Sequence, residues 1–170
     1  AERSHLLSDR ITLETHVMDV INLIRHNDMR DVVLVGHSYA GVILTVVADR
    51  IPQFLRHIVY LDAMVPLPGE CAMDMIPRHD AAQRIYRAHH DGGVSVPVPA
   101  PGHFASDAMR DWFQAHMTPQ PLKPYLERID IRPPQGNGVP VTYVSCVPVR
   151  HPSIVLSAER ARRVPLWRVI

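Results

Sequence analysis

The alternation of apolar and polar residues predicts a helix, a strand, a second helix and a second strand in the first third of the chain. The first helix starts after Thr12, where apolar residues recur at helical spacing: Leu13, Val17, Val20, Ile21 and Ile24. The short apolar runs Val32–Val35 and His57–Leu61 are typical of buried parallel strands, and the apolar segment Val42–Ala48 between them is long enough for a helix. Two strands joined by one helix form a right-handed βαβ unit.

The remainder of the chain divides into an irregular segment and a second α/β segment. Residues 66–138, called the excursion below, hold most of the 16 prolines and predict short helices near residues 71–75 and 81–89. A better helix is expected at 106–117, with Trp112 and Phe113 as apolar anchors. A third strand (Val141–Val147), a helix over 154–163 capped by Ser153 and a fourth strand (Leu166–Ile170) follow. The whole pattern predicts a parallel sheet with helices on both faces.

The junction between the first strand and the second helix reads GHSYAG, which leaves no room for a loop. A Ser at such a turn is the pattern of a nucleophile elbow, in which the backbone of the Ser is strained and its hydroxyl is exposed. Side chains two residues before and after Ser38 would collide, and Gly36 and Ala40 occupy those places, with Gly41 next. The N-terminus of the following helix offers N–H groups to a developing oxyanion. A Ser that merely caps an ordinary buried helix is the alternative.

With these motifs the chain resembles the α/β-hydrolase superfamily, and most of all bacterial esterase-like relatives of plant methylesterases and hydroxynitrile lyases. Besides GHSYAG, the segments DRITLETHVMDVINLI, RHIVYLDAMVP, TPQPLKPYLERI and VPVTYVSC carry the resemblance. It implies a hydrolase core of residues 1–65 and 139–170, with the excursion as a small cap over the site. It also implies Ser38 as nucleophile, the Tyr39 N–H as oxyanion donor, and Gly36, His37, Ala40 and Gly41 as the elbow around them.

A serine nucleophile needs a His base oriented by a carboxylate, and the usual acid of the family is missing. No Asp or Glu lies between Ile131 and Ala158, and Val149 stands near the expected place. Asp62 ends the strand next to the elbow strand, on the same rim as Ser38, and is the alternative acid. Otherwise Asp62 binds the backbone of a neighbouring loop.

The usual His is also absent. In the family it follows the last strand, and the sequence ends at Ile170, inside that strand. By position His151 is the best substitute among the 11 histidines. His37 is expected to point away from Ser38 into the fold. Three histidines of the excursion could hang over the site, but are more simply solvated polar residues: His89, His90 and His103.

The missing acid and His, together with an oxyanion donor expected upstream of Ala1, predict a weak or inactive esterase. The elbow strand is then an exposed apolar edge, so we expect either a second copy of the chain to cover it or a longer gene product. A hydroxynitrile-lyase-like proton transfer is an alternative, which a cation near Ser38 would favour; Lys123 is the chain's single Lys. A non-catalytic protein that binds a small ligand or a partner chain is another.

Composition changes this picture little. The net charge of +1 indicates no basic face for nucleic acid, and no apolar run is long enough to span a membrane. The 2 cysteines, Cys71 and Cys146, are too few for a disulfide scaffold, and Cys146 is expected in a buried strand, so a reducing cytoplasm is the expected compartment. The histidines near residues 79 and 89 lack Cys or Glu at ligand spacing, and we expect no metal and no cofactor.

Overall fold

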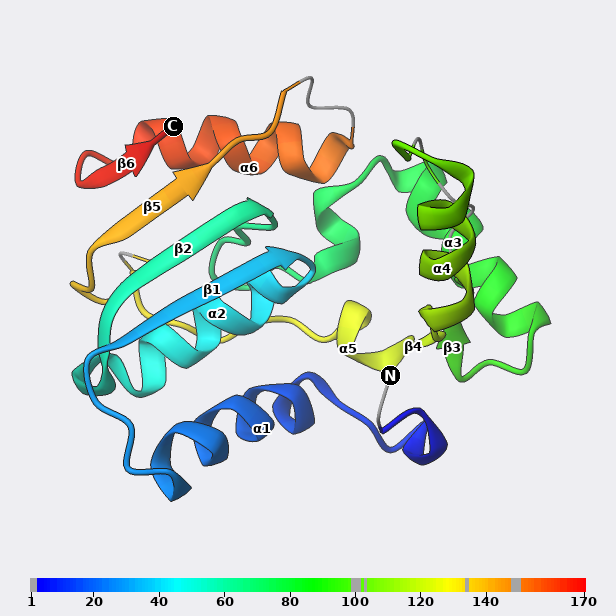
Figure 1. Ribbon diagram of the computed structural model, residues 1–170, viewed down its shortest axis with the longest axis horizontal. Coiled ribbons are helices and arrows are strands. Elements are labelled where there is room, and N and C mark those ends of the chain that lie inside the picture. Colours follow the sequence, from blue (N-terminus) through cyan, green and yellow to red (C-terminus); the bar gives the residue numbers. More distant parts are fainter. Residues whose placement is uncertain (1–2, 99–101, 103, 134, 148–150) are drawn as a thin grey trace.

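A four-stranded parallel sheet organises the chain. The computed structural model describes residues 3–98, 102, 104–133, 135–147 and 151–170. The strands lie in the spatial order β1-β2-β5-β6, as Figure 1 shows. Their bounds are β1 Val32–Ser38, β2 Leu55–Ala63, β5 Val141–Val144 and β6 Trp167–Val169. The elbow strand β1 is therefore an edge strand of this sheet, as the sequence predicts.

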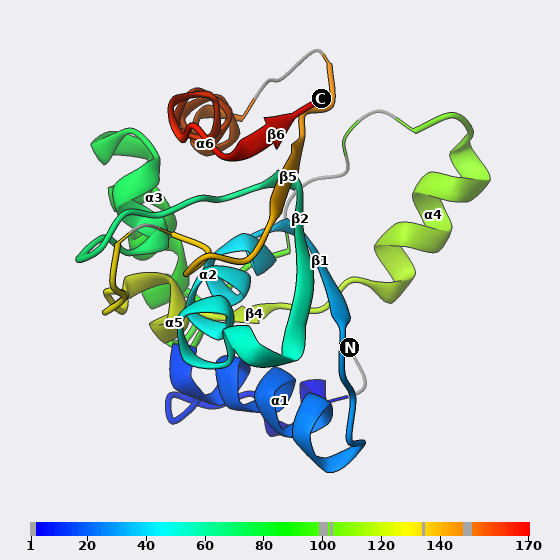
Figure 2. The same cartoon turned by 90° about the vertical axis from the view of Figure 1, so that its left-hand side faces the viewer.

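The helices of the core gather on one face of the sheet. Helices α2 (Ala40–Arg50) and α6 (Pro152–Arg163) lie on that side in Figure 2, and α1 (Leu13–His26) packs against α2. The predicted first helix is confirmed down to its cap, since the Thr12 side chain accepts from the Thr15 N–H at 3.2 Å. Two short 3₁₀ helices complete this part, η1 (Ser4–Leu6) and η2 (Pro52–Phe54).

The opposite face of the sheet is not covered by any helix among the described residues, which corrects the expected cover on both faces (Figure 2). Val33 and Val35 of β1 are 43% and 57% exposed, whereas Ile58 and Tyr60 on the helix side of β2 are fully buried. Side chains alternate along a strand, so every second residue of β1 points away from α2. An apolar face thus meets solvent next to the sheet edge.

The start of α6 also differs from the sequence prediction. The helix begins at Pro152 with His151 as its N-cap, so Ser153 lies inside the first turn and is fully buried. Proline is favoured at this first position because its missing N–H has no helical partner there and its φ is already helical. The preference of Ser for the N-cap was therefore overridden by the proline before it.

The strand β5 ends earlier than the apolar pattern predicts, at Val144 rather than Val147. Cys146 consequently lies beyond the sheet and is exposed, which corrects its expected burial in a strand; Cys71 is buried. The pattern fails here because valines continue past the point at which the strand loses its neighbours β2 and β6.

The described residues of the excursion form three α-helices, one 3₁₀ helix and a small antiparallel pair of strands. Its elements are η3 Ala72–Met75, α3 Arg78–His90, β3 Ser95–Val96, α4 Asp107–His116, β4 Gln120–Pro121 and α5 Lys123–Leu126. β3 pairs with β4, which brings Val96 beside Gln120. Helix α4 projects from the body in Figure 2 and buries no residue, so Trp112, 63% exposed, is not the predicted anchor. Its aromatic rings instead contact close neighbours along the chain, His116 and Phe104.

Candidate active site

The predicted elbow lies at the carboxyl end of β1. Ser38 is the last residue of the strand and has a φ of +55°, a left-handed conformation that non-glycine residues rarely adopt, and α2 starts two residues later. A Cβ placed on Gly36 would lie 2.3 Å from Leu44 Cδ1 and 3.2 Å from the Cβ of Ala40. A Cβ on Gly41 would lie 2.1 Å from the carbonyl oxygen of Met64. The small residues therefore allow α2 to follow the strand directly and to pack closely on β1 and β2.

Asp62 lies beside the elbow on the neighbouring strand. The pairing of β1 with β2 shifts between His37↔Leu61 and Ser38↔Ala63, so that Asp62 falls at an irregular step, with a φ of +41°. Two residues with strained backbones, Ser38 and Asp62, thus lie at the same edge of the sheet. Residues of this kind cluster at functional sites. The carboxylate of Asp62 accepts the backbone N–H of Cys146 at 2.8 Å. In this arrangement it holds the chain that leaves β5, the loop-binding role considered for it above.

His151 is held at the start of α6 by both of its ring nitrogens. Arg84 of α3 lies 2.9 Å from Nε2, and Ser153 Oγ lies 2.8 Å from Nδ1. A guanidinium can only donate, so Nε2 accepts and the proton is on Nδ1, facing Ser153. Burial, and then the charge of Arg84, lower the pKa of His151. The ring is neutral in this arrangement, and its basic nitrogen is occupied by Arg84 rather than by Ser38.

The other predicted candidates lie in exposed positions. His37 is exposed on the uncovered sheet face rather than pointing into the fold, because it alternates with Val33 and Val35 along β1. His89 and His90 end α3 and are exposed, and Lys123 starts α5 and is also exposed. Val149 and His103 lie outside the described residues. Over the part of the chain that is described, no group of three or more His, Cys, Asp or Glu side chains could hold a metal.

The ring of Tyr39 makes contacts that the sequence did not reveal. Tyr39 is 8% exposed and stacks on Tyr125 of α5, with ring centroids 4.3 Å apart and an interplanar angle of 22°. Its hydroxyl lies 3.4 Å from Nδ1 of His16 on α1, and burial raises the pKa of its phenol. The residue after Ser38 is therefore held by rings from two other helices. The sequence motif around Ser38 gives no sign of these partners, because His16 lies 23 positions and Tyr125 86 positions from Tyr39 along the chain.

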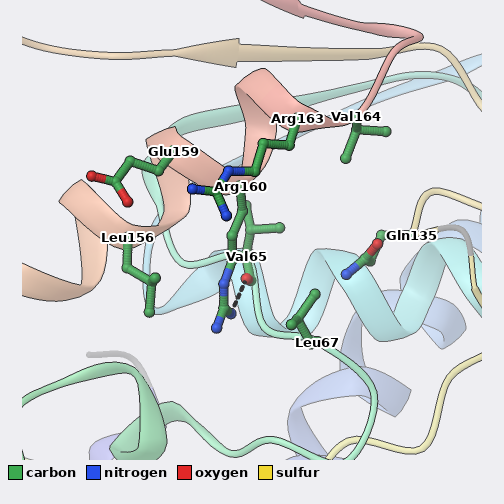
Figure 3. Close-up of a pocket in the computed structure, with 8 residues that line it drawn as sticks. All are labelled: Val65, Leu67, Gln135, Leu156, Glu159, Arg160, Arg163 and Val164. Carbon is green, nitrogen blue, oxygen red and sulfur yellow. Dashed lines mark hydrogen bonds between the residues drawn. The ribbon is translucent and has the colours of Figure 1, made fainter.

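A cavity of about 380 Å³ lies away from the elbow, between α6 and the loop after β2 (Figure 3). Val65 and Leu156 form part of its wall, and the guanidinium of Arg160 crosses it to the carbonyl oxygen of Val65 at 2.9 Å. Arg160 also binds both carboxylate oxygens of Glu70, at 2.6 and 2.8 Å. Its cation is therefore already paired, and none of the predicted site residues lines this cavity.

Comparison with known proteins places this geometry in a family. The sequence profile of the alpha/beta hydrolase family matches residues 3–169. The chain belongs to the alpha/beta hydrolase family. This membership agrees with the parallel sheet and with the strand-to-helix junction at Ser38.

Two relatives illustrate how far the similarity extends. The carbendazim hydrolyzing esterase of Nocardioides sp. (strain SG-4G) is 39% identical over 133 residues, which cover 73% of this chain and 55% of that protein. The chain thus spans little more than half of that curated relative. An extracellular alpha/beta-hydrolase from a Paenibacillus species superposes with a TM-score of 0.79 at 22% identity, over 96% of this chain and 71% of its own.

A third relative is a plant protein. Tomato methylketone synthase I, in complex with 2-tridecanone, has a TM-score of 0.68 at 12% identity, over 94% of this chain and 69% of its own. At such identities the two structural neighbours establish the fold.

Within the described residues, no helix is both long and apolar enough to cross a membrane.

Proposed function

We propose that this chain hydrolyses carboxylic esters or similar acyl bonds, with Ser38 as the nucleophile and the backbone N–H of Tyr39 as an oxyanion donor. The observation that carries the proposal is the strained Ser38, at a φ of +55° between β1 and α2, among residues too small to block the turn. The Ser38 oxygen would attack the acyl carbon while its proton passes to a base, and the bond to the alcohol would break, so that the alcohol leaves with that proton. Water would then cleave the acyl-enzyme, which releases the carboxylic acid and restores the Ser38 hydroxyl. The positive end of α2 favours the negative charge that develops on the acyl oxygen.

The proposed acid and base are both bound to other partners in the structure. Asp62 is the proposed acid and His151 the proposed base, both at the carboxyl side of the sheet. His151 can take the proton of Ser38 only after Nε2 is released from Arg84. The Nδ1–H of His151, which faces Ser153 Oγ, would likewise have to reach a carboxylate oxygen of Asp62, whose Oδ1 accepts the Cys146 N–H. We therefore propose a slow enzyme, since losing a triad member costs roughly 10⁴–10⁶ in rate.

The proposed substrates are small ester-like molecules. The relative from Nocardioides carries the name of an esterase that hydrolyses carbendazim, which makes carbendazim a substrate worth testing beside simple esters. The excursion is the proposed cap, because η3, α3 and α5 lie around the end of the sheet at which β1 carries Ser38 (Figure 1). A reducing cytoplasm is the proposed compartment, which the two free cysteines support.

Hydrolysis of 4-nitrophenyl acetate and of carbendazim tests the proposal. The wild-type chain is compared with Ser38→Ala and with Ser4→Ala, a serine in the η1 turn far along the chain from the elbow. A rate above background that is lost in Ser38→Ala and kept in Ser4→Ala supports the proposal. Equal rates for the wild type and Ser38→Ala on folded protein would reject Ser38 as the nucleophile.

A further inference from the structure

The excursion has a hydrophobic core of its own, separate from that of the sheet. Its buried members are Cys71, Met73, Ile76, Ala88 and Leu122. The core around the sheet contains Tyr39 and the buried face of α2. Tyr125 of α5 packs against both cores. One side chain therefore touches the packing of the excursion and the packing of the elbow at once.

Tyr125 contacts both strand β4 of the excursion and Tyr39, the residue after the proposed nucleophile. Its hydroxyl donates to Oε1 of Gln120 on β4, the strand that pairs with β3. Its ring stacks on Tyr39, whose backbone follows Ser38 directly. Burial raises the pKa of the Tyr125 phenol to about 12, so the hydroxyl keeps its proton and remains a donor near neutral pH.

The opposite side of Tyr39 is also supported. The ring of His16 meets that of Tyr39 edge to face, with centroids 6.0 Å apart. Burial lowers the pKa of His16, so the ring is neutral at pH 7 and adds no charge beside the phenol. Tyr39 is thus held between a core helix and a helix of the excursion. The ring and the backbone N–H belong to one residue, the N-cap of α2, so a ring that is held on both sides restrains the backbone of that residue.

We propose that Tyr125 is a positioning residue, which holds Tyr39 and thereby fixes the N–H that faces the developing oxyanion. This inference rests on the proposed role of Tyr39 in ester hydrolysis. An oxyanion donor stabilises a transition state only if its direction is fixed before reaction. The stack couples this direction to the packing of the excursion, so that a substrate that reorders the excursion changes the reactivity of Ser38.

Three variants separate this role from simple packing. Tyr125→Leu removes the stacked ring and the hydroxyl, whereas Tyr125→Phe keeps the ring and removes only the bond to Gln120. Tyr86→Leu is the matched control, because Tyr86 is a 67% exposed tyrosine of the same excursion. The stability of each variant is first measured by urea unfolding. Rates are then compared only at temperatures at which every variant is fully folded.

Two readouts are measured on each variant. The first is the second-order rate at which a fluorophosphonate modifies Ser38, and the second is the ¹⁵N order parameter of the Tyr39 amide. We expect Tyr125→Leu to slow the modification about 3- to 10-fold, the range expected for one aromatic pair, and to lower the order parameter. Tyr125→Phe and Tyr86→Leu should match the wild type in both.

The outcomes distinguish this inference from the proposed function. If Tyr125→Leu changes stability but neither readout, or if Tyr125→Phe falls as far as Tyr125→Leu, stacking does not position Tyr39 and the inference is wrong. If the wild type does not react with the fluorophosphonate, the proposed function fails. The order parameter of the Tyr39 amide then still decides whether Tyr125 holds it.

Discussion

The guanidinium of Arg84 donates to Nε2 of His151 across 2.9 Å, and so occupies the nitrogen that a general base would use. Arg84 belongs to the excursion and His151 to the start of α6, so the contact also joins these two parts. Whether His151 can serve as a base therefore depends on this bond.

Removing Arg84 should release His151. In Arg84→Met the ring loses its donor and a nearby positive charge, and its pKa should rise toward the usual value. We expect Ser38 to react with a fluorophosphonate at least about tenfold faster, since a general base contributes roughly 10²–10⁴-fold. Mass spectrometry of samples quenched at successive times measures the rate of this modification. Arg87→Met, an exposed position on the same helix, is the control, and an equal gain in Arg84→Met/His151→Gln would rule out His151 as the base.

Stability should depend on pH through His151 and His16. Burial lowers the pKa of both, so the unfolded chain binds more protons than the folded one as the pH falls toward and below about 6.5. The free energy of unfolding should thus decrease on acidification through this range and level off above about pH 7. For His151 the charges that act on the ring are those of Arg84 and Asp80, both on α3. His151→Gln should flatten the dependence in urea titrations, and an unchanged slope would contradict the assignment.

Gly41 should be the least replaceable glycine of the elbow. The Cβ of Gly41→Ala would meet the backbone of Met64, which cannot move without β2, whereas that of Gly36→Ala would meet the flexible end of Leu44. We expect losses of about 3 kcal/mol for Gly41→Ala and about 1 kcal/mol for Gly36→Ala. Gly102→Ala, with nothing within 4 Å, is the control for urea unfolding. A smaller loss at Gly41 than at Gly36 would contradict this packing.

The uncovered sheet face should promote self-association. Val35 is 57% exposed at the edge strand, so Val35→Lys should change stability by less than about 0.5 kcal/mol and reduce association. Leu34→Lys, one residue away on the face that packs against the core, should cost more than about 2 kcal/mol. Sedimentation velocity and urea unfolding measure the two effects. A wild type that stays monomeric at high concentration would count against the predicted second copy at this edge.

The sequence predicted the core elements well because each has a local signal. The helical spacing from Leu13, the cap at Thr12 and the apolar strands around GHSYAG all lie where the structure has them. The edge position of β1 followed from the family resemblance. Local signals fail where packing between distant segments decides the outcome: the pattern predicts Trp112 as an apolar anchor of its helix, yet no residue of α4 is buried.

The site was harder to predict, because its geometry depends on contacts between distant residues. Ser38 and its small neighbours form a contiguous motif, and its strained backbone agrees with the prediction. Arg84 is 67 positions from His151, and Cys146 is 84 positions from Asp62, so nothing local could reveal that these partners occupy the proposed base and acid. The stack of Tyr39 on Tyr125 likewise joins two residues that are far apart in the sequence.

The intact mass of the chain after exposure to a fluorophosphonate tests the central claim, an activated Ser38, most directly. We expect a single adduct on the wild type that is absent in Ser38→Ala, formed slowly because the proposed base and acid are bound to other partners. Folding of both proteins is checked by circular dichroism. A folded wild type that gains no adduct, or a Ser38→Ala variant that gains the same one, would contradict the claim.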